Sequence, residues 1–397
     1  METYLIDWAN LLVRWLHVTA GIAWIGASFY FVMLDLSLRK PAKKSDLQRG
    51  VFGELWAVHG GGVYHSEKFM AGPHNEALPE HLHWSKWEAY TTWLSGMTML
   101  AIVYWHGANT YLIDASVMSL SVPQAIAISL FSIVIGWVIY DVLCRSMARH
   151  ENTLALAVFI LVVLADWLLF QVFSGRAAYL HVGAIMGSIM VGNVFFHIIP
   201  GQKKMIAQIR AGQTPDPKYG IIGKQRSVHN TYFTLPVLFV MISNHYPMTY
   251  SHPQGWLVLA VIMMAGVLIR QFFVQRHLHQ QQWWLPLLAL LLLAALVVYL
   301  KPPALASTGN AVSFSSVKSI IDQRCVPCHA NEPSQPGFAQ PPKGIVLQQF
   351  QQIHQHRALI AQVVGSRYMP IGNLTAMTDA ERASLLAWIA QGAKQKP

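Results

Sequence analysis

The chain has 397 residues, of which 54% are hydrophobic and only 12% charged, and its formal net charge is +10. Soluble proteins contain about 25% charged residues, so this composition argues against a water-soluble enzyme. Most of the basic residues lie in connections between apolar segments, which favours membrane orientation over nucleic-acid binding as the account of the positive charge.

Eight apolar segments follow one another along the first three quarters of the chain. Each is close to the roughly 20 residues that an α-helix needs to cross a bilayer. Glu2 and Asp7 precede the first segment and no small-residue cleavage site follows it, so we interpret it as a retained helix and not a secretory signal. The predicted spans are residues 8–34, 87–111, 123–143, 153–173, 178–199, 228–246, 255–274 and 283–300.

The distribution of Lys and Arg predicts the orientation of these spans. The connections after the first, third, fifth and seventh spans are rich in basic residues, whereas the opposite face has only Arg176. Basic loops face the cytoplasm, so the N-terminus and everything after residue 300 are predicted to lie outside. In a Gram-negative bacterium this arrangement places a multi-pass protein in the inner membrane, with its C-terminal part in the periplasm.

Two segments of the chain resemble each other and suggest an internal repeat. Residues 15–31 align with residues 179–195, with His17 over His181. Each segment is followed by a basic loop and another span, which predicts two parallel four-helix halves with quasi-equivalent histidines. The alternative is that apolar helices resemble one another by composition alone.

Two long cytoplasmic connections, residues 35–86 and 200–227, contain most polar residues of the inner face. Residues 58–69 of the first connection read V-H-G-G-G-V-Y-H-S-E-K-F and end in the candidate catalytic residues Glu67 and Lys68. Three consecutive glycines allow close approach of the backbone to a ligand, or form a flexible turn.

Several histidines fall inside predicted spans, where ionisable residues are costly and often functional. His17, His181 and His245 lie towards the outer half and are candidate ligands of a haem b or another metal centre. His197 and His229 lie towards the cytoplasmic half and are candidate catalytic residues that contact the substrate or pair as ligands. The alternative is that such histidines only form hydrogen bonds between helices.

The residues after the last span differ in character from the bundle. Residues 301–312 form a linker rich in Pro, Gly and Ser, and a separate domain is predicted over residues 313–397. It contains Cys325-Val326-Pro327-Cys328-His329, the C-x-x-C-H pattern of covalent haem c attachment. The two thiols bond to the porphyrin vinyl groups and His329 binds the iron, whereas zinc is disfavoured because no second C-x-x-C exists.

The surroundings of this motif resemble a class I cytochrome c. Helices are predicted near residues 313–324 and 347–364, and Thr378 and Glu381 form a capping box that opens a final helix. Met369, in a loop between the helices, is the expected sixth iron ligand, with Met377 as the competing candidate. His and Met ligation of one haem c suits one-electron transfer.

The order of these features, together with W-E-A-Y-T-T-W-L-S-G at residues 87–96, H-N-T-Y-F-T-L-P at residues 229–236 and the H-G-G-G-x-Y segment, resembles a known family. The whole chain is similar to the bacterial membrane-bound urate oxidases with a C-terminal cytochrome c domain. This resemblance implies an oxidoreductase of purine catabolism that converts urate to 5-hydroxyisourate. It also implies that electrons pass through haem c to a respiratory-chain acceptor, either a terminal oxidase or a soluble cytochrome c.

The sequence thus predicts an all-α protein with three parts. These are an eight-span bundle of the urate oxidase type at residues 1–300, the linker at 301–312, and the small cytochrome c domain at 313–397. Two other functions fit the same pattern. One is a membrane protein that oxidises quinol or another donor without urate chemistry, and the other is a transporter or anchor fused to a haem sensor.

Overall fold

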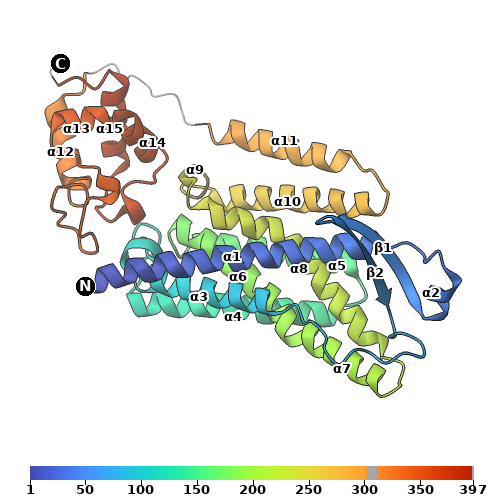
Figure 1. Ribbon diagram of the computed structural model, residues 1–397. Coiled ribbons are helices and arrows are strands. Elements are labelled where there is room, and N and C mark those ends of the chain that lie inside the picture. Colours follow the sequence, from blue (N-terminus) through green and yellow to red (C-terminus); the bar gives the residue numbers. More distant parts are fainter. Residues whose placement is uncertain (302–310, 396–397) are drawn as a thin grey trace.

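The computed structural model describes residues 1–301 and 311–395, so most of the predicted linker at 301–312 lies outside the described residues. The chain is 67% helical and has few strands. The N-terminal part (Figure 1) consists of α1 (Glu2–Leu36), α2 (Lys44–Gln48), β1 (Val51–His59), β2 (Gly62–Phe69), α3 (Trp87–Leu100), η1 (Ala101–Trp105), η2 (Ala108–Leu112), α4 (Val122–Ser146), α5 (Glu151–Phe170), α6 (Gly175–Gly192), η3 (Asn193–Ile198), α7 (Ile199–Arg210), α8 (Pro217–Ser243), α9 (Pro247–Tyr250), α10 (Gly255–His277) and α11 (Trp284–Tyr299).

Helical segments lie at all eight predicted span positions. Among the described residues, five helices are long and apolar enough to cross a membrane, namely Tyr4–Leu36, Val122–Ser146, Glu151–Phe170, Gly175–Arg210 and Gly255–His277. The second predicted span is divided, because α3 continues into the π-helical segments η1 and η2 on either side of Gly107. The last span, α11, is apolar but has only 16 residues. The structure therefore confirms several apolar helices, and the number eight stays a prediction.

Helix α6 lies at the centre of the bundle. Of the most apolar part of Gly175–Arg210, 67% is buried inside the protein, compared with 6% for α1. Helix α6 packs against α3, α4, α5 and α8, so its side chains are enclosed on all sides. Helix α1 packs mainly on α3 and leaves its other face exposed, as expected for a helix that contacts lipid.

A β-hairpin corrects the prediction of an all-α fold. Strands β1 and β2 pair antiparallel within the first long connection, with Val58 opposite Val63. Gly60 and Gly61 form the turn with φ values of +60° and +79°, a backbone conformation that glycine adopts without steric cost. Two of the three consecutive glycines therefore form the turn of a hairpin, and the third, Gly62, begins β2. Both strands are largely exposed, so their sequences lack the alternation of apolar and polar residues that predicts a half-buried strand.

The C-terminal part is a separate helical domain with its own apolar core. Its elements are α12 (Phe314–Arg324), η4 (Pro342–Gly344), α13 (Phe350–Gln355), α14 (Arg357–Gly365), η5 (Ile371–Asn373) and α15 (Asp379–Ala390). The predicted capping box is confirmed, because Thr378 and Glu381 exchange side chain to backbone hydrogen bonds at the start of α15. Val317, Ile321, Leu385 and Trp388 form the core between α12 and α15.

Figure 1 shows the arrangement of the parts along the bundle. The C-terminal domain lies at the end of the bundle where α1 begins, and the β-hairpin lies at the opposite end. The hairpin connection carries many basic residues, so the two ends differ in charge as the positive-inside rule expects for a membrane protein.

Close helix packing at Gly192 yields a prediction about stability. A Cβ atom at Gly192 would lie 2.2 Å from Nε1 of Trp137, whereas at Gly187, in the same helix, no atom lies within 4 Å. We expect Gly192→Ala to destabilise the protein by about 1–3 kcal/mol, because a rigid indole ring must move. Gly187→Ala is the matched control and should be neutral or stabilising by up to about 1 kcal/mol. Thermal unfolding of the detergent-purified variants measures both, and equal melting temperatures would contradict this packing.

Candidate functional site

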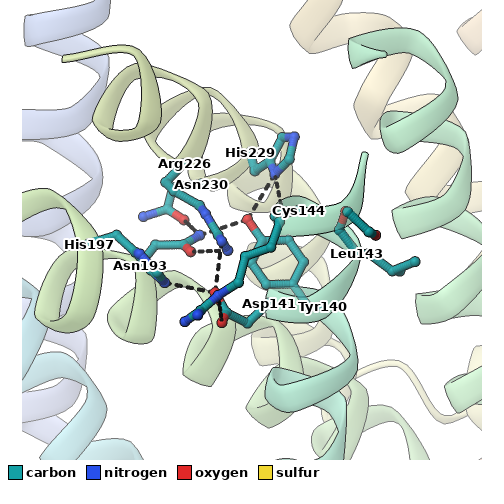
Figure 2. A network of polar contacts seen from close by, with 11 residues as sticks. Tyr140, Asp141, Leu143, Cys144, Asn193, His197, Arg226, His229 and Asn230 are labelled. Carbon is teal, nitrogen blue, oxygen red and sulfur yellow. Dashed lines mark hydrogen bonds and ion pairs between the residues drawn. The ribbon is translucent and has the colours of Figure 1, made fainter. Parts of the chain in front are cut away.

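A buried polar network joins α4, η3 and α8 in the half of the bundle nearer the hairpin (Figure 2). Its charged centre is Asp141, whose Oδ1 lies 2.7 Å from Nη2 of Arg226 and 2.7 Å from Nε2 of His197. Nε of Arg145 lies 2.7 Å from the other carboxylate oxygen. Arg226 is 2% exposed and Asp141 6%, so this ion pair is almost fully removed from solvent.

Amide and hydroxyl groups extend the network towards His229. Nδ2 of Asn193 donates to the Tyr140 hydroxyl at 2.9 Å and to Oδ1 of Asn230 at 2.9 Å. The Tyr140 hydroxyl lies 2.8 Å from Nδ1 of His229. Arg226 donates to Oδ1 of Asn193 at 3.3 Å, so Asn193 links the charged centre to His229.

Helical spacing explains why these residues meet. On α4, Tyr140 and Cys144 lie four residues apart and share a face, and Cys144 contacts Nδ1 of His229 at 3.7 Å. On α8, Arg226 and Asn230 are likewise four residues apart. Asn193 and His197 belong to η3, a π-helical segment between α6 and α7. Such segments are rare and often occur at functional sites, because the extra residue per turn changes the direction of the side chains.

The arrangement has two chemical capacities. The imidazoles of His197 and His229 can accept or donate protons through Asp141 and Tyr140 respectively. Nε of Arg226 is buried and has no hydrogen-bond partner among the described residues, so one cationic donor remains available. Ionisable groups held at membrane depth are candidate functional groups.

The structure brings both predicted histidines of the inner half, His197 and His229, into one network from different elements. Sequence reasoning missed Arg226 because it was assigned to a cytoplasmic loop before a span at residues 228–246. Helix α8 in fact begins at Pro217, so Arg226 lies on the third turn of a helix and is buried. Amides such as Asn193 and Asn230 gave no signal in the sequence, because an apolar pattern does not show which polar residues face one another.

The other two candidate catalytic residues lie on the hairpin and have different partners. Lys68 forms an ion pair with Asp35 at the end of α1. Glu67 accepts a hydrogen bond from Arg49 at 3.1 Å, and this carboxylate raises the pKa of the guanidinium. The structure does not connect either residue to the network around Asp141.

The outer histidines have different hydrogen-bond partners. Nδ1 of His17 lies 2.9 Å from the Thr92 carbonyl oxygen, which leaves Nε2 without a hydrogen bond among the described residues. His181 is fully buried, and both of its ring nitrogens are engaged, by the Ala177 carbonyl at 2.8 Å and the Ser129 hydroxyl at 2.6 Å. In the described part of the chain these two histidines are not hydrogen-bonded to each other, and His245 is exposed in the turn after α8.

Within residues 1–301 and 311–395, no group of three His, Cys, Asp or Glu side chains is placed to hold a metal ion. A centre in the bundle would therefore depend on one or two histidines. Of the predicted pair, His17 has the free Nε2 atom that such a role requires, since ligating histidines commonly donate Nδ1–H to a carbonyl.

The C-x-x-C-H motif follows α12 and is compatible with a covalently attached haem. Both thiols are free, and burial raises the pKa of Cys325 to about 12. Nδ1 of His329 lies 2.9 Å from the Ile345 carbonyl oxygen, so its Nε2 atom is the one left to bind iron. Cys328 is partly buried on the same turn.

The two candidate methionine ligands lie in different surroundings. Met369 is partly buried in the loop before η5, and its carbonyl oxygen accepts a hydrogen bond from Arg382 at 2.6 Å. Met377 is 3% exposed and belongs to the apolar core against which Cys325 packs.

Comparison with known proteins gives one match. The family model described as "Urate oxidase N-terminal" matches residues 3–301, which comprise the whole helical bundle. No curated protein and no solved structure matches the chain.

Substitutions of Asp141 and of Arg226 are predicted to reduce stability by different amounts. Asp141→Asn leaves Arg226 buried with no anion, and removing one partner of a buried pair costs about 3–5 kcal/mol. Arg226→Met should cost less, because Asp141 keeps Arg145 and His197 as partners. Arg145→Gln, at an exposed position, should change stability by less than about 1 kcal/mol. Thermal unfolding in detergent gives the order, and an Asp141→Asn protein that melts like the wild type would show that the pair is unimportant.

Proposed function

The chain belongs to the family described as urate oxidase N-terminal, and on that premise we propose that it oxidises urate to 5-hydroxyisourate in a bacterial inner membrane. Family membership over residues 3–301 is the observation that carries the proposal. It supports an oxidoreductase with a urate-related function, and the C-x-x-C-H motif supports the route by which electrons leave.

The proposed reaction determines which molecules, protons and electrons the protein must bind or release. Urate and one water molecule give 5-hydroxyisourate, two protons and two electrons, with a new bond between the water oxygen and C5 of urate. A bound haem c supplies a one-electron acceptor, so each urate requires two successive electron transfers. The protein itself must bind a planar anion, admit water and release protons.

Four residues would hold the haem. Cys325 and Cys328 have free thiols for the porphyrin, and the hydrogen bond from His329 to the Ile345 carbonyl orients that imidazole. Met369 is the proposed sixth ligand, on the basis of its position in a loop after α14. We propose that residues 313–397 form a class I cytochrome c domain, which the three main helices and the capping box support.

The proposed location follows from charge and from the arrangement of the ends. The basic hairpin connection and the C-terminal domain lie at opposite ends of the bundle (Figure 1). The positive-inside rule then gives a periplasmic N-terminus and a periplasmic haem domain. Electrons would leave from there to a terminal oxidase or a soluble cytochrome c.

The central test is reduction of the haem by urate. Purified full-length protein, oxidised and kept without oxygen, should show haem c reduction after urate is added, with two haems reduced per 5-hydroxyisourate formed. Cys325→Ser/Cys328→Ser is the control, which should lack covalent haem and show no such reduction. If a quinol reduces the haem and urate does not, the protein is a quinol-oxidising electron-transfer protein and the proposal is wrong.

The ligand assignment has its own test. We expect Met369→Ala to abolish the near-infrared sulfur-to-iron band and to lower the haem potential, because the thioether favours the reduced iron. Met377→Ala is the matched control and should retain the band, although it loses some stability because Met377 is buried. Loss of the band in Met377→Ala alone would reassign the sixth ligand.

A further inference from the structure

A cavity lies where the bundle meets the C-terminal domain. Its volume is about 470 Å³, within the range of roughly 300–1,000 Å³ that is usual for small-molecule sites. The bundle contributes the loop after η2, the beginning of α6 and the turn after α9, and the C-terminal domain contributes the loop around η5 and the beginning of α15. We call this space the junction cavity.

Close contacts fix the two walls of the junction cavity relative to each other. A Cβ atom at Gly372 would lie 3.3 Å from the carbonyl oxygen of Thr110 and 3.4 Å from that of Ile113, so the two backbones are nearly in contact. The rings of Tyr250 and Tyr368 meet edge to face across the boundary, with their centroids 6.4 Å apart and an angle of 72° between the ring planes. The two walls of the cavity therefore contact each other directly at these residues.

The junction cavity has more positive than negative charge. Three arginines and two aspartates line it. Arg367 is paired with Asp379 at 2.9 Å, and Asp114 accepts a hydrogen bond from the Ser116 hydroxyl. Arg176 and Arg382 form no salt bridge with any described residue.

The two unpaired arginines are held in place by neutral partners. Nε of Arg176 donates to the side-chain oxygen of Asn244 at 2.9 Å, and its guanidinium lies 5.1 Å from the ring centroid of Tyr111. Arg382 donates to the carbonyl oxygens of Val364 and Met369. Two fixed cations from opposite walls, with nearby tyrosine rings, form a site suited to a planar anion.

We propose that the junction cavity binds the urate anion, with Arg176 contributed by the bundle and Arg382 by the C-terminal domain. This assignment rests on the proposed function and states where in the protein urate binds. Urate is planar and anionic at neutral pH, so guanidinium donors and aromatic faces match both its charge and its shape. The proposal also means that urate enters from the side of the C-terminal domain.

Urate bound in the junction cavity would lie close to the haem domain, so its electrons need not cross the membrane. The hydrocarbon core of a bilayer is about 30 Å thick, which is too far for one efficient electron transfer from the inner network to an outer haem. A ligand in the junction cavity lies beside Met377, which lines the cavity and belongs to the core on which Cys325 packs. Two electrons from urate then need no centre inside the bundle to reach the haem domain.

Binding of urate without turnover tests the proposal. Purified full-length protein is kept free of oxygen with its haem reduced by dithionite, so that it cannot accept electrons, and radiolabelled urate is added in equilibrium dialysis. We expect Arg176→Gln to raise the Kd about tenfold to a hundredfold, as for loss of one charged hydrogen bond. Arg176→Lys, which keeps the charge, should bind with intermediate affinity. Arg210→Gln removes an arginine outside the cavity and is the matched control, with unchanged Kd.

A second variant changes the affinity in the opposite direction. Asp379→Asn removes a carboxylate from the cavity wall and should tighten urate binding about twofold to fivefold, which a merely destabilised protein would not do. If Arg176→Gln and Asp379→Asn bind urate like the wild type, while the wild type still reduces its haem with urate, the cavity assignment is wrong and the proposed function stands. If the wild type neither binds urate nor is reduced by it, both proposals are wrong.

Discussion

The ion pair between Arg226 and Asp141 is the interaction that most constrains the bundle. A buried guanidinium in a membrane domain is costly unless an anion and hydrogen-bond acceptors surround it. Asp141 and Asn193 supply these from α4 and η3, so three elements must hold one relative position. The π-helical form of η3 serves the same end, because within six residues it presents Asn193 to α8 and His197 to Asp141 of α4. His229 is linked to this centre through Tyr140 and Asn193.

The bundle has a second constraint at its other end, where its surface must fit the C-terminal domain. Gly372 lies against the backbone of Thr110 and Ile113, and at a φ of +55° glycine allows this close approach without the strain that a side chain would add. Ser174 strengthens the same region from within the bundle, since its hydroxyl donates to the Tyr111 carbonyl and also caps α6. The two ends are thus held by different interactions. A buried ion pair stabilises the end nearer the hairpin, and close backbone packing joins the other end to the C-terminal domain.

Much of the fold was predictable from the sequence, because apolar runs and the C-x-x-C-H motif are local patterns. Helices lie at every predicted span position, and the capping box at Thr378 is confirmed. Contacts between distant residues were not predictable, such as that between Asp141 and Arg226, which lie 85 positions apart. Misplacing the start of α8 by about three turns made Arg226 look like a loop residue. The proposed equivalence of His17 and His181 is also not matched by their surroundings, since one lies on a peripheral helix and the other at the buried centre.

Arg382 belongs both to the wall of the junction cavity and to the surroundings of Met369. Its side chain is 7% exposed and lines the junction cavity, while it donates to the carbonyl oxygens of Val364 and Met369. A guanidinium has five N–H donors, so these bonds leave others to face the cavity. Because the same side chain contacts the cavity and the loop of the proposed sixth ligand, a shift of that loop must move one wall of the cavity. On the proposed assignments, an anion bound at this wall would be coupled to the position of Met369 through Arg382, without any relay through the membrane.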